Sequence, residues 1–212
     1  MAQPRLNRLG VLASGRGSNF AALADAERAG RLGGSIAVLL VDRADAPARE
    51  EARRRGIREL ALDPGPKRTV LTAEAERRFA DTLLEHGVTV VLLAGFLRIL
   101  HQGFLDAFPM AVMNIHPSLL PAFPGLDAPR QALAHGVAVT GCTVHLVDGS
   151  LDNGPILAQA AVPVLSGDDV ASLTERIHAA EHRLYPETVC RFLASPPRID
   201  GRRAVWSDGE GG

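Results

Sequence analysis

The chain has few of the residues that mark several large classes of protein. Its 212 residues include two cysteines, Cys142 and Cys190, which form neither a CxxC pair nor a disulfide framework. This cysteine usage suits a reducing compartment, so we expect a cytoplasmic protein. The first apolar run, residues 9–13, is broken by Gly10 and is too short for a signal peptide. No apolar stretch approaches the roughly 20 residues of a membrane span.

The chain also lacks a strong charge of either sign. Its Lys and Arg residues number 23 and its Asp and Glu residues 24, which leaves a net charge of −1. A chain so balanced exerts no global pull on nucleic acid or membrane, so we expect small-molecule partners. Its length suits one domain, which we place at residues 1–206, with a disordered tail at 207–212. We expect a monomer or a weak homodimer.

The first half of the chain alternates short apolar runs with helical patterns. This order predicts a parallel sheet with right-handed crossovers, whose ligands bind beyond the carboxyl ends of the strands. The unbroken Val, Leu and Ala run at 88–94 is typical of a strand covered on both faces. The predicted strands are residues 9–13, 35–41, 57–62 and 88–94, and the predicted helices are residues 20 to about 30, 47–55 and 72–86.

The second half predicts a different arrangement. Two apolar runs, 137–147 and 155–165, flank a loop of turn-forming residues and therefore predict an antiparallel hairpin. An apolar stripe from residue 169 to about 193 predicts a long C-terminal helix. The expected fold is thus a single-domain α/β fold. A Rossmann-like parallel sheet in the N-terminal half continues into the hairpin, with the long helix at the C-terminal end.

Residues 113–121 carry the strongest chemical pattern. Asn114 and His116 lie two apart, so they point to the same side of an extended chain where a strand runs into a proline-stiffened loop. The amide can donate a hydrogen bond to a carbonyl oxygen, and the imidazole can move a proton near neutral pH. The pair therefore suits acyl transfer, although an isolated Asn-x-His also fits a buried pair that only satisfies itself.

A glycine-rich turn follows the first predicted strand. Gly17, Ser18 and Asn19 lead from that strand into a helix, an arrangement that aims free backbone N–H groups at an anion. Phe20 occupies the third glycine position of the dinucleotide fingerprint, so that motif is absent. The turn predicts either a phosphate or carboxylate site or a tight turn that binds nothing.

Three further features allow two interpretations each. Residues 95–100 suit either the wall of a pocket for a flat ring, with Arg98 meeting an acid, or a core-packing turn. Asp152 is either an ordinary turn residue or a carboxylate that favours the charged form of a nearby His116. His178, Glu181 and His182 match the H-x-x-E-H zinc pattern. Because no further ligand can be assigned, we expect no metal there.

Several of these motifs occur in the order found in one family. The chain resembles the folate-dependent formyltransferases over residues 9–193, and among them the branch that formylates glycinamide ribonucleotide in purine synthesis. The resemblance is carried by residues 13–19, 93–100, 114–121, 124–126, 151–156 and 181–186.

The resemblance implies a set of roles and a co-substrate, 10-formyltetrahydrofolate, with no metal. The implied catalytic residues are Asn114, His116 and Asp152. Those implied to bind glycinamide ribonucleotide are Gly17, Ser18, Asn19, His178 and Glu181. The implied folate-binding residues are Leu97, Arg98, Ile99, Leu100, Asn114, Val147 and Asp152, with Arg98 facing the acidic tail.

The chain departs from the family pattern at two places. A second tail-binding arginine common in the family aligns near Ala73, so Arg68 is the candidate to replace it. After Gly125, where the family usually has histidine-containing sequence, this chain has Asp127 and Pro129.

Three other functions remain as alternatives. A 10-formyltetrahydrofolate hydrolase would usually carry an extra N-terminal regulatory domain, for which we expect no room before Leu9. A methionyl-tRNA formyltransferase would add a basic C-terminal domain. A non-catalytic module that binds a phosphorylated metabolite would not need the Asn114, His116 and Asp152 set.

Overall fold

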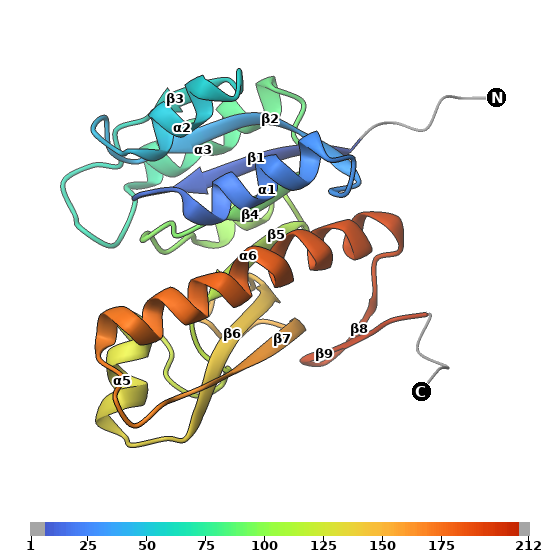
Figure 1. The fold of residues 1–212 in the computed structure, drawn as a ribbon. Helices are drawn as coiled ribbons and strands as arrows, with labels where there is room; N and C mark the ends of the chain where they lie inside the picture. The colour runs from blue at the N-terminus through green and yellow to red at the C-terminus, as the bar shows by residue number, and fades with distance from the viewer. Residues whose placement is uncertain (1–6, 208–212) are drawn as a thin grey trace.

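The computed structural model of the chain describes residues 7–207, and within them nine strands form one sheet. The strands pair in the order β3-β2-β1-β4-β5-β6-β7-β9-β8 (Figure 1). From residue 208 onward, the predicted disordered tail lies outside the described residues. The strands are β1 Asn7–Ala13, β2 Gly34–Val41, β3 Glu59–Ala61, β4 Val90–Leu93, β5 Val112–His116, β6 Val139–Leu146, β7 Ile156–Pro163, β8 Arg198–Asp200 and β9 Arg203–Val205.

The sheet changes character at β5. Strands β3, β2, β1, β4 and β5 pair in parallel, as the alternating first half of the sequence predicts. On its other side β5 pairs antiparallel with β6, and β6 and β7 form the predicted antiparallel hairpin. The expected α/β fold is confirmed. The third strand is shorter than predicted, because only Glu59–Ala61 pairs with β2.

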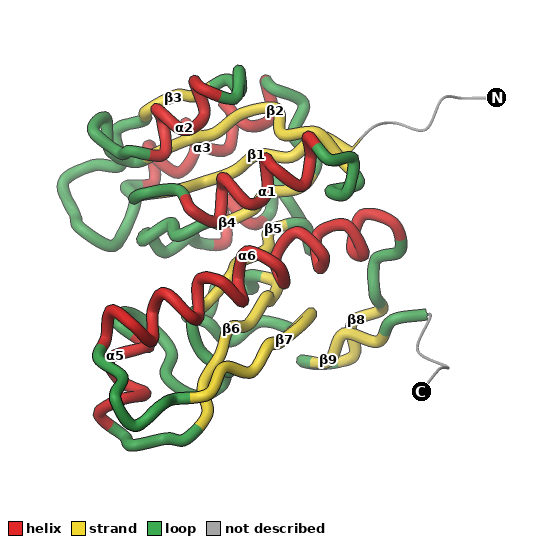
Figure 2. Tube along the Cα trace, in the orientation of Figure 1, coloured by secondary structure: helices red, strands yellow, loops and turns green. Residues whose placement is uncertain are grey.

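Helices cover both faces of the sheet (Figure 2). Apolar residues of α1, α2, α5 and α6 join one core with alternate residues of the strands. The other core lies beneath α3 and α4, and α4 is a short helix that the sequence patterns did not predict. The helices are α1 Ser18–Arg28, α2 Ala48–Arg54, α3 Ala73–Glu85, α4 Gln102–Leu105, α5 Ala128–Ala134 and α6 Val170–Ala194.

The start of α1 is fixed by Gly17, which precedes the helix with a φ of 80°. A Cβ at this position would lie 2.7 Å from the Cβ of Ala48 at the start of α2. Glycine therefore meets two demands here, a left-handed backbone and a close approach between two helix N-termini. This keeps the first turn of α1 open at the carboxyl edge of β1.

The long helix α6 is anchored both at its start and along its buried face. Asp169 accepts a hydrogen bond from the Ser172 N–H at 2.8 Å, and the Ser172 hydroxyl accepts one from the Asp169 N–H, which completes a capping box. Further along, the buried Tyr185 hydroxyl lies 3.2 Å from the Leu93 carbonyl and 3.0 Å from that of Met113. These contacts tie α6 to β4 and β5 and so fix the side chains that α6 presents at their ends.

Candidate active site

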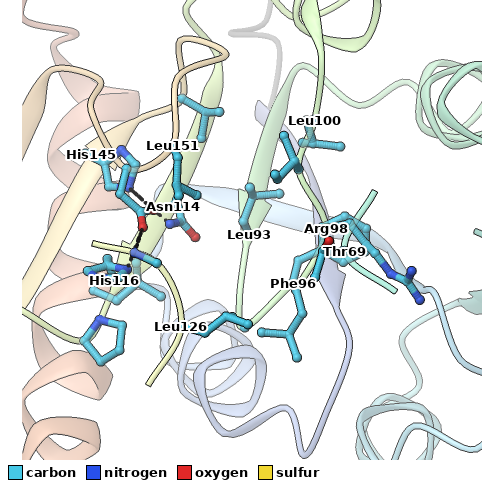
Figure 3. Close-up of a pocket in the computed structure, with 18 of the residues that line it drawn as sticks. Thr69, Leu93, Phe96, Arg98, Leu100, Asn114, His116, Leu126, His145 and Leu151 are labelled. Carbon is cyan, nitrogen blue, oxygen red and sulfur yellow. Dashed lines mark hydrogen bonds and ion pairs between the residues drawn. The ribbon is translucent and has the colours of Figure 1, made fainter. Parts of the chain in front are cut away.

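A cavity of about 450 Å³ lies beyond the carboxyl ends of β4 and β5. Figure 3 shows Asn114, His116 and His145 gathered at one side of it, with Phe96, Arg98 and Leu100 across from them. Glu181 of α6 and residues 149–152 also line it. The cavity lies where ligands of parallel sheets bind, as the strand order predicts.

His116, at the end of β5, has an oxygen acceptor at each ring nitrogen. Its Nε2 lies 2.9 Å from the carbonyl oxygen of Phe123, and its Nδ1 lies 3.4 Å from Oδ2 of Asp152. The side chains of His116 and Asp152 are only 6% and 11% exposed. A proton on Nε2 satisfies the Phe123 carbonyl, and Nδ1 lies within ion-pair distance of the Asp152 carboxylate.

The Phe123 carbonyl is held in place by a hydrogen-bond network under the loop. The buried Ser118 hydroxyl donates to the carbonyl oxygens of Ala122 at 2.6 Å and Phe123 at 3.3 Å. Thr143 of β6 donates from its hydroxyl to the Ser118 carbonyl at 2.7 Å and accepts from the Leu120 N–H at 3.0 Å. The loop after β5 is therefore rigidly supported by the neighbouring strand.

Asp152 adopts a backbone conformation that is unusual for its type, with a φ of 47°. The same oxygen that faces His116 accepts a hydrogen bond from the Gly125 N–H at 2.7 Å. The carboxylate thus joins the loop after β6 to the loop after β5. A strained backbone held by such a contact is typical of functional positions.

His145 is a lining residue that the sequence patterns did not single out. It lies on β6 directly opposite Asn114, and its Nε2 is 3.1 Å from the Asn114 amide nitrogen. Its Nδ1 lies 2.9 Å from the Leu146 carbonyl, so Nδ1 carries the proton and Nε2 accepts from Asn114. Burial lowers the pKa of His145, which keeps this ring neutral and fixes the direction of the amide.

The start of α1 and the middle of α6 meet at a second polar group. Asn19 donates from its amide to Oε2 of Glu181 at 2.8 Å, and His178 lies 4.0 Å from the same oxygen. Burial raises the pKa of Glu181 to about 7, against the opposing effect of the Asn19 hydrogen bond. The buried Oδ1 of Asn19 has no hydrogen-bond partner among the described residues. Asn19, His178 and Glu181 line the cavity, and Gly17 and Ser18 lie at the adjoining helix N-terminus.

The predicted apolar wall also lies at the cavity. Leu97, Ile99, Leu100 and Val147 are lining residues, and Leu97 is 56% exposed. Arg98 belongs to the same wall, but its Nε donates to Oδ2 of Asp42 at 2.5 Å. Asp127, one of the departures from the family pattern, lines the cavity just before α5.

The H-x-x-E-H pattern does not gather ligands at one point. The rings of His178 and His182 stack with centroids 6.1 Å apart, while Glu181 turns to Asn19. No group of three potential metal ligands occurs among residues 7–207. Within the same range, no helix combines the length and apolar character needed to cross a membrane.

Comparison with known proteins relates this arrangement to one family. The model of the formyl transferase family matches residues 7–189. The chain is 38% identical to phosphoribosylglycinamide formyltransferase of Escherichia coli, covering 94% of this chain and 93% of that protein. It is also 38% identical to the Bacillus subtilis enzyme of the same name, with 89% and 95% covered. A trifunctional purine biosynthetic protein of Drosophila pseudoobscura is 42% identical, but the chain spans only 14% of its length.

Solved structures agree with these relatives. Glycinamide ribonucleotide transformylase 1 from Symbiobacterium toebii has a TM-score of 0.92 and 50% identity, covering 97% of this chain and 96% of that one. A formyltetrahydrofolate deformylase from Pseudomonas syringae, at 24% identity and a TM-score of 0.88, shares the fold. The chain therefore belongs to the formyl transferase family, together with the phosphoribosylglycinamide formyltransferases.

Proposed function

We propose that this chain transfers the formyl group of 10-formyltetrahydrofolate to the primary amine of glycinamide ribonucleotide in purine synthesis. The observation that carries the proposal is the meeting of Asn114, His116 and Asp152 at one side of a cavity with an apolar opposite wall. This arrangement offers hydrogen-bond donors and a proton carrier where two substrates can face each other. The family relationship supports the same reaction.

The first step is attack of the amine nitrogen on the formyl carbon. As the new C–N bond forms, the carbonyl oxygen becomes an oxyanion. One amide proton of Asn114 is directed to His145, which leaves the second for the oxyanion. The Nδ1–H of a doubly protonated His116 supplies a neighbouring positive charge. Donors fixed before the reaction stabilise such an oxyanion because they need no reorganisation.

The second step breaks the bond between the formyl carbon and N10 of the folate. The amine loses a proton and N10 gains one, so proton movement balances within the site. The 3.4 Å contact between His116 Nδ1 and Asp152 is longer than the roughly 2.7–2.9 Å of a tight charge-assisted hydrogen bond. The Nδ1 proton is therefore free to pass to the substrate directly or through water, while Asp152 compensates the charge of the ring.

The two substrates are assigned to different parts of the cavity. Gly17, Ser18 and Asn19 offer the phosphate a helix N-terminus, and Glu181 and His178 offer the ribose polar contacts. The Oδ1 of Asn19, which has no hydrogen-bond partner within residues 7–207, suits a ribose hydroxyl donor. Across the cavity, the side chains of Leu97, Ile99, Leu100 and Val147 suit the flat pterin ring, and exposed Arg68 suits the carboxylate tail.

The chemistry places limits on what else the reaction requires. The formyl group is already activated on its carrier, so the protein has to supply only positioning and charge, and we propose no metal. Small molecules are the proposed partners, with neither nucleic acid nor membrane, and the proposed state is a cytoplasmic monomer or weak homodimer.

A formyl-transfer assay with 10-formyltetrahydrofolate tests the proposal. We expect rapid loss of the formyl group with glycinamide ribonucleotide as acceptor and much slower loss in water. Equal rates with and without the nucleotide would instead indicate a hydrolase. Nucleotide binding without any turnover would indicate a binding module.

A further inference from the structure

We propose that Asp42 and Arg98 form a buried clamp that positions the cavity wall at residues 95–100. In this view Arg98 acts on folate binding through the position of the wall, and it does not pair with the carboxylate tail. Asp42, which no sequence motif marks, becomes a positioning residue for the same step. The inference rests on the proposed function in that it assigns this wall to the folate.

The ion pair is short and almost fully shielded from water. Arg98 Nε lies 2.5 Å from Oδ2 of Asp42, and the two side chains are 9% and 2% exposed. A terminal nitrogen of Arg98 also donates to the carbonyl oxygen of Lys67. Asp42 directly follows β2 and Arg98 follows β4, so the pair bridges two strands that have β1 between them.

The backbone of the wall is held by the same neighbours. Ser14, just after β1, donates its N–H to the Gly95 carbonyl at 3.1 Å and accepts from the Leu97 N–H at 3.0 Å. The Ile99 N–H donates to the Thr69 carbonyl at 2.9 Å. Arg98 lies between these two anchored residues, so its clamp fixes the stretch from which Leu97 and Ile99 project at the cavity.

The charges explain why the clamp stays closed. Removing either member of a buried ion pair leaves an uncompensated charge in a medium of low dielectric constant. The second oxygen of Asp42 is buried and has no hydrogen-bond partner within residues 7–207, and Arg98 is the cation in direct contact with this carboxylate. If Arg98 turned toward the carboxylate tail of the folate, its ion pair with Asp42 would break. Figure 3 places Arg98 on the side of the cavity away from His116.

Asp42→Asn separates the two roles of Arg98 because it keeps the shape of the side chain and removes its charge. If the pair positions the wall, KM for 10-formyltetrahydrofolate rises by about tenfold, within the range that coupled contacts reach. An analogue lacking the glutamate tail suffers the same rise, and KM for the nucleotide stays constant. If Arg98 binds the tail, Asp42→Asn releases the cation. KM then falls for the folate with the tail and is unchanged for the truncated analogue, which would overturn the proposal.

Hydrogen exchange gives a readout that does not depend on turnover. We expect the Leu97 and Ile99 amides to exchange about tenfold faster in Asp42→Asn, because the clamp limits local opening of the wall. Asp45→Asn is the matched control, since Asp45 lies in the same loop with a side chain 72% exposed. Unchanged exchange at Leu97 and Ile99 would reject the clamp, even if the wild-type chain showed no formyl transfer.

Arg98→Lys is the second test variant, to be used if the Asp42→Asn protein does not fold. A lysine keeps the positive charge but loses the planar fork that reaches both Asp42 and Lys67. The clamp predicts the same rise in KM for both folates with Arg98→Lys, whereas a loss confined to the folate with the tail would contradict it.

Discussion

At the scale of single residues, the site depends on one carboxylate with three contacts. Asp152 faces His116 at 3.4 Å, His145 at 3.8 Å and the Gly125 N–H at 2.7 Å. It therefore lies against both imidazoles and ties two loops together, and in the proposed mechanism it also compensates the charge of His116. The loop contact and the charge compensation can be separated, because an amide of the same shape keeps an oxygen for Gly125 and loses the negative charge.

Asp152→Asn is expected to reduce kcat by roughly 10²–10⁴-fold, the scale on which a positioned proton-transfer group acts. KM for the nucleotide should change little, because Asn19 and Glu181 lie on other elements. Steady-state kinetics on both substrates provide the measurement. Asp148→Asn is the control, since Asp148 is an exposed residue of the same loop. Equal losses in the two variants would assign Asp152 a purely structural role.

Glu181 gives a prediction about stability and pH. Because burial raises its pKa to about 7 from the ordinary 4.5, the folded chain binds a proton that the unfolded chain releases between these values. Stability therefore falls as pH rises from about 4.5 through about 7. Glu181→Gln removes this cost, and it should stabilise the protein by about 3 kcal/mol at pH 8 and by less than about 1 kcal/mol at pH 5.

Urea unfolding at pH 5 and pH 8 measures the effect of Glu181→Gln. Glu187→Gln, at an exposed position of the same helix, should show no difference between the two pH values. If Glu181→Gln were equally stable relative to wild type at both pH values, the buried carboxylate would not be the source of the pH dependence.

Single residues also show where reading the sequence succeeds. Asn114 and His116 are close in sequence, so strand periodicity alone places them on one side of β5. The sequence patterns do not single out His145, because its partner Asn114 is 31 residues away. The sequence indicates this contact only when two predictions are combined. If the first strand of the predicted hairpin pairs antiparallel with β5, Asn114 and His145 lie side by side. The catalytic and binding roles of these residues stay predictions.

At the scale of elements, the turn before α1 is defined by a contact between two helix N-termini. Gly17→Ala would force a side chain into a left-handed backbone and to within 2.7 Å of the Ala48 Cβ. We expect a loss of about 1–3 kcal/mol in stability, the scale of backbone strain and overpacking. We also expect weaker nucleotide binding, because the first turn of α1 must shift. Thermal unfolding and nucleotide titration measure both effects.

Gly15→Ala is the control for that substitution. A Cβ on Gly15 would meet nothing within 4 Å, and its backbone is not left-handed. We expect near wild-type stability and binding from it. A large effect from Gly15→Ala, or none from Gly17→Ala, would contradict the packing account of the turn.

Elements also differ in how well the sequence predicts them. The long helix α6 and the buried strand β4 follow directly from their apolar patterns. The short helix α4 does not, because four residues are too few for a period to emerge. The third strand is predicted at residues 57–62, but its length is not, because only Glu59–Ala61 pairs with β2.

At the scale of the whole molecule, the reaction is expected to run without a metal. Dialysis against EDTA should leave formyl transfer unchanged, and elemental analysis should find no stoichiometric zinc. The physical reason is that the folate already activates the formyl group, so no Lewis acid is needed. The control is addition of zinc to the dialysed protein. If dialysis abolished activity and added zinc restored it, the result would support a zinc site at His178, Glu181 and His182.

The overall architecture is well predicted because alternating strand and helix patterns imply a parallel sheet with right-handed crossovers. Side-chain partners at long range are not, and Arg98 shows why. From sequence its cation is equally suited to a substrate acid and to any acid of the fold. Asp42, 56 residues earlier, becomes its neighbour only when β2 and β4 take their places beside β1.

The position of β5 between a parallel and an antiparallel neighbour has a consequence for how this family can change. Asn114 pairs with Leu93 on one side and with His145 on the other. Because side chains alternate, a slip of one residue along β5 would present Met113 and Ile115 to the cavity and bury the amide and imidazole in the core. A slip of two residues would turn the amide and imidazole back toward the cavity but would move Asn114 away from His145. The strand therefore tolerates insertions only in its flanking loops. Which alternate positions of β5 face the cavity matters for the chemistry as much as which residues occupy them.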